Sequence, residues 1–124
     1  EPDRTRGSDW ALISLAGEVA SAGPPLALSG ALPALGTEVM VGGYAQDNPN
    51  VLTADTLCRI TAVATDPRGR RLLQHDCAAT HGVSGAPLLA RSASGWMIVG
   101  INVARLKVAP VGLAVALDGV LSSR

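Results

Sequence analysis

The chain has 124 residues, with ten Lys+Arg against ten Asp+Glu, so its formal net charge is zero. A balanced charge argues against a dedicated binder of nucleic acid or anionic membranes, because such proteins carry a basic excess that attracts phosphates. Aromatic residues make up 2% of the chain, which argues against platforms for stacking single-stranded bases. Hydrophobic residues at 48% suffice for one compact domain, and no apolar run approaches the length of a transmembrane helix.

The first half of the chain predicts two short strands separated by a linker. Residues 9–16 combine one acid, Asp9, with a mostly apolar run and are predicted to form a strand. Residues 23–33 are broken by prolines and glycines and are predicted to be irregular. Alternation of polar and apolar residues predicts a strand at 37–41, which the following glycine pair ends.

The second half predicts a hairpin and further strands. Strand-like runs lie at 52–63, 70–75, 96–103 and 112–117, and another begins at Pro87. Residues 66–69 form a turn between the first two runs, since Pro67 presets φ and Gly69 completes the turn. Asp118 is placed to cap a short C-terminal helix. About six strands in roughly 90 residues suggest a small antiparallel barrel or sandwich.

The segment Gly82-Val83-Ser84-Gly85-Ala86-Pro87 is the most informative motif. Glycines on both sides of Ser84 permit a tight turn that directs the N–H groups of Gly82 and Ser84 into one space. Two converging amides form an oxyanion hole, and the serine hydroxyl beside them would be a nucleophile. The nucleophile elbow of α/β-hydrolases is excluded because its second glycine comes two residues after the serine. The other interpretation of the segment is an ordinary hairpin turn.

This segment resembles the Gly-x-Ser-Gly-x-Pro motif of the trypsin-like (chymotrypsin-fold) serine peptidases, especially compact bacterial members related to the glutamyl endopeptidases. Asp9-Trp-Ala-Leu is similar to the family's strand that carries the catalytic aspartate. Val99-Gly100-Ile101 resembles the strand that lines its specificity pocket, and Gly112-Leu-Ala-Val-Ala resembles its closing strand. The resemblance extends from Asp9 to about Leu117, which is nearly the whole chain.

The resemblance implies an all-β fold. The expected architecture is an antiparallel six-stranded Greek-key barrel, the second barrel of a trypsin-like double barrel, plus a strand from the first barrel. Residues 1–22 would then be a remnant of the N-terminal barrel that carries the catalytic aspartate. Residues 23–124 would form the C-terminal barrel that carries the nucleophile and the specificity pocket.

By the same resemblance, Ser84 is the nucleophile, the amides of Gly82 and Ser84 form the oxyanion hole, and Asp9 orients the catalytic histidine. That histidine precedes the aspartate in this family, and no histidine precedes Asp9 here. His81 is expected at the rim of the pocket and His75 in a strand, so neither is assigned as the general base. We therefore expect an N-terminal barrel segment outside these residues to supply the histidine, and the 124-residue chain alone to be inactive.

The expected specificity pocket is lined by residues from two segments. They are Ala78, Ala79, Thr80, His81, Asn102, Val103 and Arg105. Ala78 stands where an acid would select Arg or Lys, so a trypsin-like preference is not expected. The small residues before His81 predict a small, mostly apolar pocket floor. Arg105 on the wall would either narrow the pocket or attract an acidic side chain, and the sequence leaves both open.

The two cysteines, Cys58 and Cys77, leave a disulfide and buried thiols both open when taken alone. A bond closing a loop of about 20 residues would contribute roughly 3 kcal/mol of stability. The resemblance implies the disulfide, and with it a secreted or periplasmic location. His75, Asp76, Cys77 and His81 lack the second pair of closely spaced ligands that zinc usually needs, so no metal and no cofactor are expected.

The expected function is a serine endopeptidase that hydrolyses peptide bonds in a protein or peptide substrate through an acyl-enzyme. The alternative is a non-catalytic pseudo-peptidase that binds partner proteins, because Val83 and Ala86 replace commoner family residues. A third interpretation is that a separate chain supplies the first barrel. We expect the unpaired edge of the strand at 9–16 to be covered by a retained fragment or by self-association. No nucleic-acid or membrane partner is expected.

Overall fold

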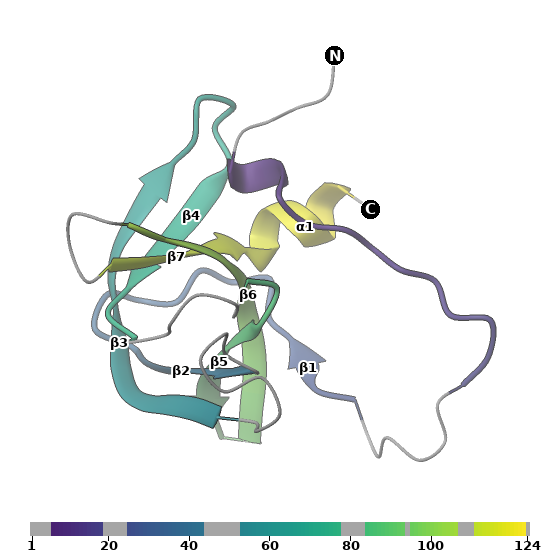
Figure 1. The fold of residues 1–124 in the computed structure, drawn as a ribbon, viewed down its shortest axis with the longest axis horizontal. Coiled ribbons are helices and arrows are strands. Elements are labelled where there is room, and N and C mark those ends of the chain that lie inside the picture. Colours follow the sequence, from purple (N-terminus) through teal and green to yellow (C-terminus); the bar gives the residue numbers. More distant parts are fainter. Residues whose placement is uncertain are drawn as a thin grey trace.

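The computed structural model describes residues 6–18, 25–43, 53–77, 84–93, 95–106 and 111–123, and its fold is all-β (Figure 1). Six strands form the barrel: β2 (Glu38–Gly43), β3 (Thr53–Thr65), β4 (Arg71–His75), β5 (Pro87–Ser92), β6 (Gly95–Leu106) and β7 (Val111–Ala116). Their order is β6-β5-β2-β3-β4-β7, and an antiparallel pairing of β7 with β6 closes the ring. The predicted six-stranded antiparallel barrel is confirmed.

One further strand, β1 (Ala27–Leu28), is bonded outside this ring, in parallel to β6. It lies in the segment that the sequence predicts to be an irregular linker. Residues 9–16, which the sequence predicts as a strand, form none, and this prediction is wrong in detail. They run outside the barrel (Figure 1), and Leu12, Ile13 and Leu15 are 69%, 77% and 68% exposed. An apolar alternation becomes a strand when a neighbour pairs with its backbone, and none of the described strands pairs with this segment.

The barrel interior is filled by small and branched aliphatic side chains. Leu73, Leu88 and Ala114 are fully buried. A Cβ added to Gly100 would lie 3.0 Å from the carbonyl oxygen of Val115, so a larger residue there would press against the β7 backbone. The interior of a small closed barrel is just wide enough for such side chains to fill, which accounts for the low aromatic content of the sequence.

The predicted turn at residues 66–69 is confirmed, and it also holds the N-terminal segment. The Gly69 N–H donates to the Asp66 carbonyl at 2.9 Å, and Gly69 has a left-handed φ of 80°. Oδ1 of the buried Asp66 accepts the N–H groups of Arg68 and Arg70, each at 2.9 Å. Its Oδ2 accepts the Gly7 N–H at 3.0 Å. Asp66 therefore closes the β3–β4 hairpin and fastens η1 (Arg6–Ser8) to the barrel.

The last described element is the helix α1 (Leu117–Ser123), which confirms the predicted C-terminal helix. Asp118 lies in its first turn, and the capping role predicted for it stays a prediction. Asp118 Oδ2 accepts a hydrogen bond from Arg71 Nη1 at 2.7 Å, which ties the helix to the start of β4. In the part of the chain that the structure describes, no helix has the length and apolar character needed to cross a bilayer.

Candidate active site

Ser84 lies exposed in a turn just before β5. The next residue, Gly85, has a φ of 87°, a left-handed conformation that residues with a Cβ rarely adopt. A Cβ added to Gly85 would meet nothing within 4 Å, so the backbone conformation and not crowding requires glycine here. The tight turn that the sequence predicts is present at Gly85, whereas Gly82 lies outside the described residues.

Strand β6 holds this turn through the main chain of Asn102. The Gly85 N–H donates to the Asn102 carbonyl at 2.6 Å, and the Asn102 N–H donates to the Ala86 carbonyl at 2.8 Å. The Ser84 hydroxyl donates to the main-chain carbonyl of Val103 at 3.2 Å. A peptide carbonyl accepts a hydrogen bond but is not a base at neutral pH, so this contact orients the hydroxyl without activating it.

The part of β6 that holds the serine turn is irregular. Asn102 lies opposite Ala114 on β7, whereas Ala104 lies opposite Leu113, so Val103 is an extra residue in the ladder. A bulge of this kind bends the strand locally and re-aims the residues around it. The two consecutive residues that contact the serine turn, Asn102 and Val103, therefore sit where the regular ladder is interrupted.

Asp9, the predicted orienting acid, is exposed directly after η1. The N–H of its neighbour Trp10 donates to the Ser8 carbonyl at 2.8 Å. Trp10 packs against a core cluster made of Leu72, Val103, Leu113 and Val115. Val103 takes part in both contacts: its side chain belongs to the cluster that Trp10 packs against, and its main-chain carbonyl accepts the hydrogen bond from the Ser84 hydroxyl.

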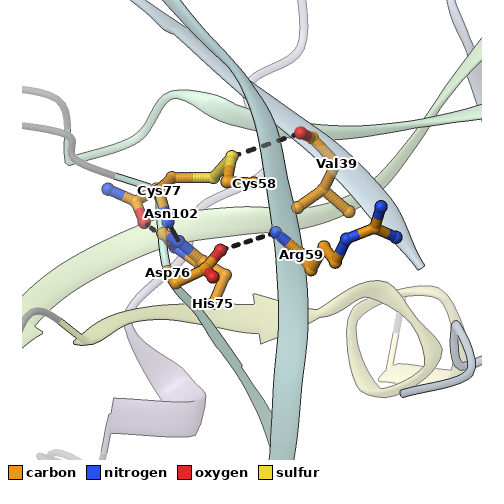
Figure 2. The surroundings of a disulfide bond; sticks show 7 residues. All are labelled: Val39, Cys58, Arg59, His75, Asp76, Cys77 and Asn102. Carbon is orange, nitrogen blue, oxygen red and sulfur yellow. Dashed lines mark hydrogen bonds between the residues drawn. A yellow bond between two sulfur atoms is a disulfide. The ribbon is translucent and has the colours of Figure 1, made fainter. Parts of the chain in front are cut away.

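A buried polar side chain, that of His75, adjoins a disulfide (Figure 2). His75 at the end of β4 is 0% exposed, and its Nε2 lies 2.8 Å from Oδ1 of Asn102. The Cys77 N–H donates to His75 Nδ1 at 3.3 Å. Cys77 is bonded to Cys58 on β3, which confirms the predicted disulfide.

Two of the potential metal ligands noted in the sequence, Asp76 and Cys77, are engaged in other bonds. The Cys77 sulfur is in the disulfide, and Asp76 Oδ1 accepts the Arg59 N–H at 2.6 Å. Among the described residues, no group of three or more His, Cys, Asp or Glu side chains is placed to hold a metal ion.

The sequence did not predict the pairing of His75 with Asn102. His75 ends β4, whose sequence is Arg-Leu-Leu-Gln-His, and its partner Asn102 lies on a strand distant in sequence, so no local pattern signals the pairing. Gly112 on β7 lies opposite His75, and a Cβ added there would overlap the imidazole ring.

Several predicted pocket residues lie outside the described part of the chain, namely Ala78, Ala79, Thr80 and His81. Val103 is buried in the barrel wall. Asn102 is 4% exposed, with its side chain bonded to His75 and its main chain bonded to the serine turn. The main chain of Arg105 lies in β6 opposite Gly112. The shape and preference of the pocket stay predictions.

Comparison with known proteins gives one family and several similar structures. The sequence model of the family described as "Trypsin-like peptidase domain" matches residues 1–101. Among curated proteins, no relative matches the chain. The inactive form of the Rv3671c protease is similar at 22% identity and a TM-score of 0.65, over 82% of this chain and 53% of that one. The active form, from M. tuberculosis, is similar at 22% identity and a TM-score of 0.63, over 82% and 48%.

The present chain therefore spans about half the length of these two crystal structures, 53% and 48%. At this level of identity, the likeness shows a shared fold.

Proposed function

Since the chain belongs to the trypsin-like peptidase domain family, we propose that it is the nucleophile-bearing part of a serine endopeptidase that works through an acyl-enzyme. The observation that carries the proposal is the exposed Ser84 beside the left-handed Gly85, held by β6 in a barrel of this family. A serine in such a turn can approach a peptide carbonyl without moving the strands behind it.

The proposed reaction has two stages. Ser84 Oγ attacks the peptide carbonyl carbon and gives its proton to a histidine that Asp9 orients. The amides of Gly82 and Ser84 stabilise the oxyanion, and the tetrahedral intermediate collapses as the histidine protonates the leaving amine. Water, deprotonated by the same histidine, then attacks the acyl-enzyme, which releases the acid and restores the Ser84 hydroxyl.

We propose that the histidine comes from a barrel segment outside these 124 residues. His75 is buried with Nε2 against Asn102, and His81 immediately precedes Gly82, so neither is suited to stand between Asp9 and Ser84. The length of the similar structures, about twice that of the present chain, also supports this proposal. The isolated chain is then inactive because it lacks the base.

The exposed residues Leu12, Ile13 and Leu15 support the same assignment. In the complete enzyme, the segment 9–16 pairs with the missing barrel and becomes the strand that its sequence predicts, with 1–22 belonging to that barrel and 23–124 to this one. Without that partner, an exposed apolar run of this kind favours self-association of the chain. A strictly monomeric chain in analytical ultracentrifugation would count against this part of the proposal.

The disulfide between Cys58 and Cys77 supports a secreted or periplasmic location, because disulfides persist in oxidising compartments. The proposed substrate is a protein or peptide.

A fluorophosphonate probe, which labels activated serines, tests the proposal. The longer protein that includes the histidine-bearing segment should be labelled at Ser84, and Ser84→Ala should abolish labelling. Ser92→Ala is the matched control, because Ser92 lies on β5 but its hydroxyl bonds the Gly95 carbonyl at 2.8 Å, away from the turn. It should be labelled like the unaltered protein.

The 124-residue chain alone should stay unlabelled. A folded longer protein that is not labelled would contradict the enzyme and favour the protein-binding module. Strong labelling of Ser84 in the isolated chain would contradict the missing base.

A further inference from the structure

The ring of His75 is fixed at both nitrogens, although the residue lies on the barrel wall and not in the proposed reaction. Because Nδ1 accepts the Cys77 N–H at 3.3 Å, the proton of the neutral imidazole sits on Nε2. Nε2 then donates to Oδ1 of Asn102 at 2.8 Å. The structure thus gives this fully buried ring one tautomer and one orientation.

The absence of a side chain at Gly112 leaves the space that the His75 ring occupies. Gly112 faces His75 across the β4–β7 ladder, and the three atoms nearest to a Cβ added there are all imidazole atoms. The backbone of Gly112 is not left-handed, so its conformation does not require glycine. The space taken by the His75 ring does require it.

Asn102 connects this ring to the serine turn. Its side chain accepts from His75, while its carbonyl and N–H bond Gly85 and Ala86. The ladder between β6 and β7 is interrupted at Val103, next to Asn102. Where a bulge removes regular pairing, the ladder alone does not fix the main chain, and a side-chain contact can do so.

The disulfide anchors the other side of the ring. Cys77 follows His75 by two residues, and its bond to Cys58 ties it to β3 (Figure 2). Cys77, whose N–H donates to His75 Nδ1, is therefore held by two strands: it follows β4 in the chain, and the disulfide joins it to β3. A run of contacts leads from the disulfide through His75 and Asn102 to the serine turn.

Burying a polar ring costs free energy unless it is hydrogen-bonded, and His75 is hydrogen-bonded at both nitrogens. An aliphatic residue of similar size would fill the same space but make neither bond. What the histidine adds is a directed bond to Asn102. We propose that His75 is a positioning residue which, through Asn102, fixes the Gly85 amide and the Ser84 hydroxyl for reaction. This role rests on the proposed function of Ser84 as the nucleophile.

Hydrogen exchange of the Gly85 amide, followed by NMR in the 124-residue chain, tests the proposal without requiring catalysis. His75→Leu should speed this exchange by about tenfold, because the bond from Gly85 to Asn102 opens locally more often. Ile60→Val is the matched control, since Ile60 is buried like His75 and lies opposite it in the β3–β4 ladder, so this change reduces packing beside the ring without removing the bond to Asn102. His75→Gln keeps an N–H donor near the position of Nε2 and should restore most of the protection.

Three outcomes would overturn the positioning role. The first is Gly85 exchange in His75→Leu that matches Ile60→Val, and the second is no rescue by His75→Gln. If His75→Leu does not fold, ¹⁵N NMR of the unaltered chain decides the matter: a proton on Nε2 supports the run of contacts, whereas a proton on Nδ1 removes the Cys77 anchor and overturns it.

The fluorophosphonate reaction of the longer protein adds the functional readout. At equal folded fraction, Ser84 labelling should be slower in His75→Leu than in Ile60→Val, and equal rates would overturn the proposal. If the unaltered protein is not labelled while Gly85 exchange still responds to His75, the proposed function fails but the structural link from His75 to the turn stands.

Discussion

Replacing Gly112 with alanine tests how closely the barrel fits around His75. Alanine is ordinarily the better strand residue, because glycine in a strand interior costs about 0.5–1 kcal/mol in backbone entropy. At this position a Cβ would overlap the imidazole ring. The ring is fully buried, with Gly112 of β7 opposite it and Asn102 of β6 at its Nε2, and has little freedom to retreat.

The expected free-energy change follows from three contributions. Overpacking a well-filled core costs about 1–3 kcal/mol. Displacing the ring lengthens the bond from His75 to Asn102, which costs about 1 kcal/mol. The entropic gain from alanine offsets about 0.5–1 kcal/mol of this. Gly112→Ala should therefore destabilise the chain by about 2 kcal/mol, opposite in sign to the propensity argument.

Urea unfolding with the disulfide intact, followed by circular dichroism, measures the change. Gly17→Ala is the control, because a Cβ there meets nothing within 4 Å, and it should shift the free energy of unfolding by less than about 0.5 kcal/mol. The double variant His75→Ala/Gly112→Ala removes the overlapping ring, so the two changes should couple by about 1 kcal/mol or more. A Gly112→Ala chain as stable as the native one, or strictly additive changes, would refute the reasoning.

Three further predictions concern stability. Asp66→Asn should lower the free energy of unfolding in urea by about 2 kcal/mol, because it weakens the charge-assisted hydrogen bonds to the hairpin and to η1. The control Glu38→Gln changes an exposed ion pair and should cost under about 0.5 kcal/mol, so equal effects of the two changes would contradict this prediction. Replacing Cys58 and Cys77 together with serine should cost about 3 kcal/mol by the same assay, from loop entropy over a separation of 19, and an unchanged midpoint would speak against it. Gly85→Ala should cost about 1–2 kcal/mol through its left-handed φ, and Gly85→Asn less; indistinguishable variants would show that the turn relaxes.

Much of the fold follows from local sequence patterns. The alternation of polar and apolar residues, together with turn residues, predicts most of the barrel strands. Residues 66–69 predict the hairpin turn because the conformation of a turn depends on neighbouring residues alone. The glycine after Ser84 predicted the tight turn for the same reason. The disulfide came from the family resemblance, since two cysteines by themselves do not determine a pairing.

The features that could not be predicted from the sequence depend on pairing between segments that are distant along the chain. The segment 9–16 has a strand's pattern, but a strand also needs a partner for its backbone. The role of His75 depends on the register that sets it opposite Gly112 and beside Asn102, and no local pattern encodes that register. Likewise, the local sequence predicts the turn at Asp66 but does not predict the hydrogen bond from the Gly7 N–H to the Asp66 carboxylate.

The hydrogen bond between Gly7 and Asp66 has a kinetic consequence, because it joins residues 59 apart in sequence. Closing so long a loop costs entropy, and the acceptor is in place only once the β3–β4 hairpin exists. We therefore expect η1 to dock after the folding transition state, so that substitutions at Gly7 speed unfolding and leave the folding rate nearly unchanged. The segment that carries Asp9 would then be the last part of the described chain to settle and the first to detach.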